Sequence, residues 1–173
     1  MGLRLKFNIV LSVVFLAGFA ATGVVSRQLL MENARQEVIR DARLMLAAAG
    51  AMRSYTVDHI QPHLVAQMSE VFLPQSVPAF AATEAVDRIR RRHAEYTYKE
   101  ATLNPTNPRN RTLDWEADVV HRFRQYTSLP EIISERPSTT GRTLFIAKPI
   151  QVTHAACLQC HGIPSSAPAS MLR

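Results

Sequence analysis

The chain has 173 residues, enough for one domain together with a targeting or anchoring segment. Apolar residues make up 47% of it and charged residues 20%, which excludes a fully disordered chain, and two cysteines are too few for a disulfide-rich scaffold. The formal net charge of +6 comes almost entirely from arginine. These arginines are scattered apart from Arg88 and the run at 90–92, so we expect a solvated helix face there and no nucleic-acid partner.

The amino terminus predicts a membrane segment. A basic start precedes an apolar run from Phe7 to Val25, which is about long enough to cross a bilayer as a helix. The alternative is a cleaved signal peptide, for which Gly18-Phe19-Ala20 is a weak cleavage site. We favour the uncleaved anchor because the run continues into polar helical sequence without a turn residue. Residues 1–27 are therefore predicted to form a signal anchor or transmembrane helix, and residues 28–173 the domain beyond it.

A long amphipathic helix is predicted from about residue 26 to residue 64, where apolar positions recur at helical spacing. Pro62 should kink or end this helix. The stripe that we expect on its inner face consists of Val38, Ala42, Met45, Ala49, Met52, Thr56, His59 and His63.

Prolines and turn residues divide the rest of the chain into shorter elements, and helices packed on a small sheet give an α+β fold class. The predicted elements are a loop around Pro74 and Pro78, a helix from Thr83 to about Tyr98, a rigid extended loop at Asn104–Asn110, a helix from about Leu113 to Tyr126, a hairpin turn at Pro137–Gly141 and an edge strand at Thr143–Val152. The side chains expected in the core are Phe72, Phe80, Val86, Ile89, His93, Tyr96, Trp115, Val119 and Phe123.

The segment Cys157-Leu158-Gln159-Cys160-His161 has the C-x-x-C-H pattern of a c-type haem attachment site. Two thiols at this spacing can form thioethers with the two vinyl groups of one haem. The adjacent His161 is then held beneath the iron as the proximal axial ligand. The motif therefore predicts one covalently bound haem c, held by Cys157 and Cys160 and ligated by His161.

Other interpretations of the motif are weighed against this one. A redox disulfide of the thioredoxin type normally needs a βαβ context, which is not evident in this sequence. A zinc site would use Cys157 and Cys160 together with His154 and His161, all four being metal-ligand types. A chance match is disfavoured because the motif lies behind an export signal in a chain with no other cysteine.

The motif also predicts the orientation in the membrane. Basic residues lie on both sides of the apolar run, so the positive-inside rule does not decide it. In bacteria, haem c is attached outside the cytoplasmic membrane. The body beyond Val25 is therefore expected in the periplasm, with the amino terminus in the cytoplasm and the anchor in the inner membrane.

In combination, these motifs resemble the PAS-like c-type haem sensor domains found in the extracytoplasmic part of bacterial histidine kinases, diguanylate cyclases and chemoreceptors. The resemblance covers nearly the whole chain. The matching stretches are Leu3-Arg4-Leu5-Lys6-Phe7, Met52-Arg53-Ser54-Tyr55-Thr56 with Pro62, Asn104-Pro105-Thr106-Asn107-Pro108 with Asn110, Trp115-Glu116, Lys148-Pro149-Ile150 and Cys157-Leu158-Gln159-Cys160-His161-Gly162.

The resemblance implies a PAS-like fold with a long N-terminal helix, flanking helices and a small antiparallel sheet that holds one haem. Members of the family usually continue past the haem motif with closing strands and an output module. Because this chain stops at Arg173, we expect its closing strands to be missing and the chain to be either the truncated sensory front of a receptor or a shortened gene product.

The distal side of the haem is open to several candidates. Both cysteines belong to the motif, so the second axial ligand is expected from the helical stripe: Met45 or Met52 first, then His59 or His63, with a water-bound or open site as the alternative. Core filling is the competing role for each methionine. Arg53 and Tyr55 are candidates for contacts with haem propionates, and a salt bridge to a nearby acid is the alternative for Arg53.

The function expected from the sequence is a membrane-anchored periplasmic haem sensor for redox state or a small diatomic ligand. The alternatives are an electron-transfer monohaem cytochrome c and, behind it, a zinc or thiol protein. The sequence contains no Ser/His/Asp set, paired carboxylate site or phosphate-binding loop, so we expect no enzyme activity. The expected partners are the membrane, the haem maturation machinery and an output module in the same or another chain, and a homodimer is compatible with this view.

Overall fold

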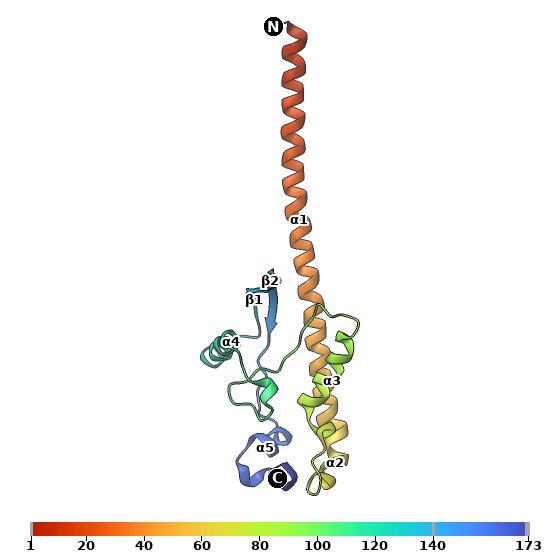
Figure 1. The fold of residues 1–173 in the computed structure, drawn as a ribbon, viewed down its shortest axis with the longest axis vertical. Helices are drawn as coiled ribbons and strands as arrows, with labels where there is room; N and C mark the ends of the chain where they lie inside the picture. Colours follow the sequence, from red (N-terminus) through yellow and green to blue (C-terminus); the bar gives the residue numbers. More distant parts are fainter. Residues whose placement is uncertain (1, 140, 172–173) are drawn as a thin grey trace. The chain divides into compact units, whose positions relative to one another are not determined.

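The computed structural model describes residues 2–139 and 141–171 of the chain. By internal contacts it divides into two units, the first ending at Asp41 and the second beginning at Ala42. Helices predominate and the sheet is small (Figure 1), which confirms the α+β class. The boundary placed after residue 27 concerns the membrane segment and stays a prediction.

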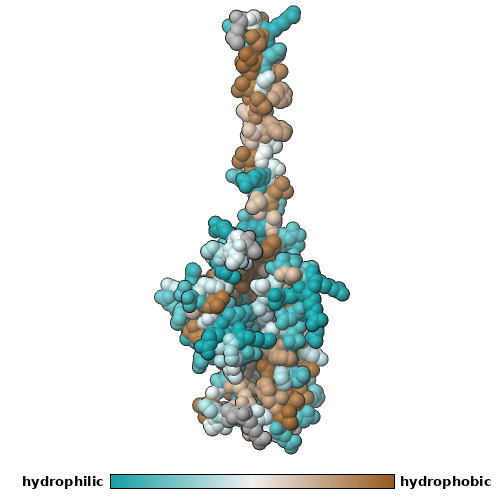
Figure 2. Space-filling model, viewed as in Figure 1, coloured by the Kyte–Doolittle hydropathy of each residue, from teal (hydrophilic) through white to brown (hydrophobic). Residues whose placement is uncertain are grey.

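The first unit consists of the N-terminal part of helix α1, which runs from Leu3 to Tyr55. Its apolar side chains are exposed, Phe19 being 81% accessible, and they gather along this part of the helix in Figure 2. By length and composition the described residues contain one helical stretch able to cross a membrane, and it begins at Leu3. An exposed apolar helix of this length is compatible with membrane anchoring.

The helix passes Pro62 through a π-helical turn. This turn spans Thr56–Ile60 and leads into helix α2, Gln61–Met68. Proline lacks an amide hydrogen, and in a continuous α-helix its ring would meet the carbonyl group of Asp58. The wider turn avoids the clash, and the Gln61 N–H donates to the Thr56 carbonyl oxygen five residues earlier. The predicted distortion at Pro62 is confirmed, although the helical path continues beyond it.

The π turn also changes which side chains are buried after it. The predicted stripe runs from Thr56 to His59 and His63, but both histidines are exposed. Gln61 and Met68 are buried instead. One extra residue in a turn rotates all later side chains by about 100° around the helix axis. The expectation that the two histidines share one face with the preceding methionines is therefore corrected.

The core of the second unit lies where helix α3, Pro78–Arg90, packs on the end of α1. Ala49 of α1 and Ala82 and Val86 of α3 are at most 2% exposed, and their small side chains let the two helices approach closely. Met45 and Tyr98 pack against this cluster. The prediction of Val86 as a core residue is confirmed.

Helix α3 differs in extent from the predicted helix at 83–98. It begins earlier because Pro78, whose fixed φ suits the first turn, follows an extended Val77. It ends at Arg90, and His93 lies exposed beyond its end. Ile89 in its last turn and Phe72 before it are also exposed, so these three residues are not part of the core.

A loop and helix α4, Asp114–Gln125, follow. Thr102 closes the loop through backbone hydrogen bonds, donating to the Asn110 oxygen at 2.9 Å and accepting from the Thr112 nitrogen at 3.2 Å. These bonds bring the two ends of the loop together, and Pro108–Asn110 forms a 3-10 turn within it, so the loop is not extended throughout; its rigidity stays a prediction. Glu116 begins α4 by accepting from the Leu113 N–H at 2.8 Å, and the same carboxylate oxygen accepts from the Lys99 ammonium group at 2.6 Å.

The sheet is a two-stranded antiparallel hairpin of β1, Ile132–Ser138, and β2, Gly141–Ala147. Gly141 has a φ of +123°, a conformation that favours glycine. The Ser138 hydroxyl donates to the Gly141 carbonyl oxygen at 2.8 Å and ties the two strand ends together. The predicted hairpin is confirmed.

The strand boundaries required correction. Strand β1 extends to Ser138 and includes Pro137, which the expected turn would have contained. A hairpin strand has one unpaired edge, where a residue without an N–H is tolerated. Strand β2 ends at Ala147 rather than Val152, two residues before Pro149.

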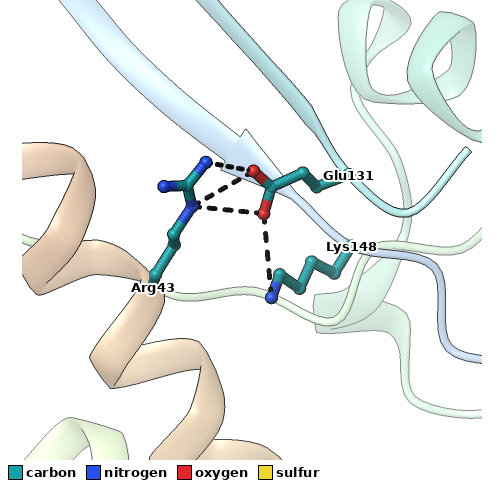
Figure 3. Close-up of polar contacts among 3 residues, drawn as sticks. All are labelled: Arg43, Glu131 and Lys148. Carbon is teal, nitrogen blue, oxygen red and sulfur yellow. Dashed lines mark hydrogen bonds and ion pairs between the residues drawn. The ribbon is translucent and has the colours of Figure 1, made fainter. Parts of the chain in front are cut away.

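A cluster of three charged residues connects α1 to the open end of the hairpin (Figure 3). Arg43 of α1 donates to a Glu131 carboxylate oxygen from Nη2 at 2.5 Å and from Nε at 3.1 Å. Lys148 reaches the other oxygen at 3.7 Å. Glu131 precedes β1 and Lys148 follows β2, so one carboxylate joins three segments. The hydrogen bond from Arg43 is the main cause of a lowered Glu131 pKa.

Glu131→Gln is expected to lower the melting temperature of the full chain in detergent at neutral pH by a small amount. Because the folded-state pKa of Glu131 lies below the ordinary value of 4.5, its stabilising contribution is complete above about pH 4.5 and is lost as the pH falls through the lowered pKa. The difference between wild type and variant should therefore shrink in acid. Circular dichroism melts at neutral pH and at acid pH measure this difference in melting temperature, with Glu70→Gln, a change at an exposed residue, as the control. An equal difference at both pH values would contradict this assignment.

Candidate functional site

The C-x-x-C-H motif lies on a short helix, α5, which spans Ala155–His161. The His154 carbonyl oxygen begins this helix by accepting from the Cys157 N–H at 2.9 Å and the Leu158 N–H at 3.1 Å. Residues three apart share one face of a helix, so Cys157 and Cys160 project together. Both cysteines are half-buried and free of disulfide bonds, and His161, the last residue of the helix, is exposed.

This donor set fits covalent haem. Attachment needs two unbonded thiols on one side of the backbone, with an imidazole next to the second thiol. The helical conformation of α5 provides the first condition, and the exposed position of His161 leaves its ring free for the second. The residues that would hold the group are therefore Cys157, Cys160 and His161.

The zinc interpretation would use the same two thiols together with His154 and His161. Burial raises the pKa of the Cys160 thiol in the metal-free chain, and the neighbouring Cys157 raises it further. Within residues 2–139 and 141–171, no three His, Cys, Asp or Glu side chains come together as a metal site.

The structure places the three distal candidates differently. Met45 is half-buried against the α1–α3 core, whereas Met52 is 36% exposed. His59 is exposed and lies 5.2 Å from the Tyr55 ring between ring centroids. Among the residues that the structure describes, no hydrogen bond, ion pair or ring contact joins these three to α5. Their role as axial ligands stays a prediction.

Arg53, a candidate for propionate contact, is paired with an acid. Its Nη1 lies 2.5 Å from Glu100 Oε2, and the two side chains are only 21% and 10% exposed. Glu100 also accepts from the Tyr98 hydroxyl at 2.9 Å, and burial together with this carboxylate raises the Tyr98 pKa well above its ordinary range. The other candidate, Tyr55, is exposed. Sequence patterns gave no signal for Glu100 or Tyr98, because Glu100, the acceptor for Tyr98, pairs with Arg53 from a distant part of the chain.

The segment after the motif contacts the end of helix α2. The Ser170 hydroxyl donates to the carbonyl oxygen of Met68 at the end of α2. Figure 1 shows this segment beside α2, with α5 next to it in the chain. The motif and the end of the π-containing helix therefore belong to the same end of the second unit.

These features define a helix-rich α+β protein with a membrane-length apolar helix and a separate helix that carries two free thiols and a histidine. The chain belongs to the Tll0287-like family, whose model, described as Tll0287, matches residues 31–173. The match includes the whole attachment motif and begins after the apolar run. No curated protein and no solved structure matches the chain.

Proposed function

We propose that this chain is a membrane-anchored periplasmic sensor domain of PAS-like fold that binds one haem c. The observation that carries the proposal is the conformation of α5, which sets two free thiols on one helix face with an exposed histidine beside them. The family match supports it, because the Tll0287-like domain is known as a periplasmic sensor domain.

The chain's own residues have separate tasks in this proposal. Cys157 and Cys160 hold the haem covalently and His161 binds its iron from the proximal side. When bound, the haem supplies an iron whose oxidation state and sixth ligand respond to redox conditions or to a diatomic molecule. The role is binding and response rather than catalysis. A response to a ligand requires different affinities for two states of the chain, and α1 is the element through which such a change would reach the membrane.

The exposure of the motif favours a second candidate, an electron-transfer cytochrome. Leu158 and His161 are both exposed, so a haem held there would offer an accessible edge to a redox partner. The two functions differ in ligand chemistry. Binding of carbon monoxide to the reduced protein supports the sensor, whereas fast electron exchange without ligand binding supports the cytochrome.

The test is expression of the full chain together with a haem c maturation system. An alkaline pyridine haemochrome spectrum should show one c-type haem per chain, and the haem stain should remain with the protein on a denaturing gel. A chain that carries no haem under these conditions would contradict the proposal and leave a zinc or thiol protein.

The proposed location is the inner membrane, with the amino terminus in the cytoplasm and the second unit in the periplasm. The exposed apolar part of α1 supports retention. The full-length chain should therefore stay in the membrane pellet after an alkaline carbonate wash of bacterial membranes. Release of a shortened, soluble product would show that the segment is a cleaved signal instead.

A further inference from the structure

A stack of three side chains joins α4 to one face of the hairpin. The Trp115 ring lies 5.1 Å from the Phe145 ring between centroids, and the Arg136 guanidinium carbon lies 4.5 Å from the centroid of the Trp115 ring. Arg136 and Phe145 occupy the same sheet face, because Arg136 pairs with Thr143, two residues from Phe145 on β2. The two rings are inclined to each other by 55°, and the Arg136 guanidinium lies over the Trp115 ring alone.

Two nitrogen donors in this stack have no acceptor. Trp115 Nε1 and Arg136 Nε are buried and make no hydrogen bond. The contact from Arg136 Nη1 to the Pro137 carbonyl oxygen is long, at 3.5 Å. Within the described parts of the chain, no carboxylate pairs with Arg136. The nearby hairpin residue Arg142, by contrast, pairs with Glu135 at 2.9 Å.

An unpaired cation in this setting is unusual. Buried polar groups are nearly always hydrogen-bonded, and here the Nε atom is buried although the Arg136 side chain as a whole is only half-buried. The aromatic ring offsets part of the cost through its cation–π contact with Arg136. It does not provide an acceptor for the Arg136 Nε–H or for the indole N–H of Trp115. Within the described residues, each of these two donors therefore lacks an acceptor, and a negatively charged acceptor would suit the one on Arg136.

We propose that Trp115 and Arg136 form a binding site for a carboxylate group. A carboxylate has two acceptor oxygens and one negative charge, and it suits the planar donors of a guanidinium. Both nitrogens are covered by protein atoms, so binding of a carboxylate requires a local rearrangement of the side chains that cover them. This restricts the occupant to a small group.

The carboxylate can come from two sources. One is a dissolved monocarboxylate such as acetate, which needs no haem. The other is a propionate of the haem, and this source rests on the proposed function. Both share the same contact chemistry, and the two arms of the experiment separate them.

The first arm uses the full chain without haem, purified in detergent. Trp115 is the single tryptophan of the chain, so its fluorescence reports on the site directly. Titration with sodium acetate, at an ionic strength held constant with sodium chloride, should give a saturable change. The dissociation constant should rise about tenfold or more in Arg136→Gln, because a charge-assisted contact is lost. It should not change in Arg142→Gln, the control on the same hairpin.

The second arm uses the haem-loaded chain. If a propionate occupies the site, Arg136→Gln should lower the reduction potential of the haem, because loss of a nearby positive charge favours the ferric state. Arg142→Gln should leave the potential unchanged. Circular dichroism confirms folding of each variant, and the wild-type titration is informative without any variant.

The outcomes separate this site from the proposed function. A saturable acetate response without haem attachment keeps the carboxylate site and overturns the haem function. Normal haem attachment with no acetate response and an unchanged potential in a folded Arg136→Gln overturns the carboxylate site alone. Absence of both the acetate response and haem overturns both.

Discussion

Replacing Cys157 and Cys160 together by alanine is expected to abolish covalent haem attachment. Each cysteine provides one thioether, so the single variants should retain weakened attachment and the double variant none. Both side chains are only half-buried and make no disulfide, so the chain should still fold. Haem staining of denaturing gels, normalised to the amount of chain, measures the effect.

Two further variants on α5 sharpen this result. Leu158→Ala changes an exposed residue between the two cysteines and should leave the stain at the wild-type level. His161→Ala should keep the haem attached but change its optical spectrum, because the proximal ligand is removed while the thioethers remain. A stain that survives in the double-cysteine variant would show that attachment does not use this motif.

Met45→Ala and Met52→Ala are expected to differ in how much they destabilise the chain. Met45 packs against the core formed by Ala49, Ala82 and Val86, so its truncation should lower the free energy of unfolding by about 2–3 kcal/mol, the lower part of the range for core methionines. Met52 is 36% exposed, and its truncation should change stability by less than about 0.5 kcal/mol. Denaturant unfolding of the haem-free full chain measures both.

In the haem-loaded chain, Met52→Ala rather than Met45→Ala should have the larger effect on the properties of the haem. A core residue is already engaged, whereas the exposed Met52 side chain is available as the distal ligand that the sequence predicts. Met52→Ala should then change the ferric spectrum, lower the reduction potential and open the iron to carbon monoxide, since a thioether ligand raises the potential. If Met45→Ala alone changes the spectrum in a folded protein, Met45 is the ligand and must leave the core. If neither variant changes it, the ligand is His59, His63 or water.

Several features of this protein depend on short stretches of sequence and were predicted correctly. The apolar helix, the distortion at Pro62, α4 and the hairpin all follow from neighbouring residues. Proline, glycine and helix-capping residues act on the backbone within one turn, so their effect is visible in the sequence. The early start of α3 at Pro78 uses the same chemistry, and it was missed only because the proline was assigned to a loop.

The buried face after the π turn could not be predicted in this way. Regular helical spacing continues from Met52 to His59 and His63, and nothing in it shows that one turn will contain an additional residue. Proline can be accommodated by a kink, a helix end or a wider turn. The packing of Thr56 and Gln61 in the second unit accompanies the wider turn here, and that packing involves residues outside the helix.

The C-x-x-C-H motif and the apolar run were determined by the sequence alone, because thioether spacing and membrane length are properties of consecutive residues. Only the tertiary structure decided that Arg53 pairs with Glu100 and that Arg136 stacks on Trp115 without a counter-ion. Each of these contacts joins residues far apart in the chain. The partner of a charged side chain is set by which segments fold together, and side-chain type and local spacing do not specify it.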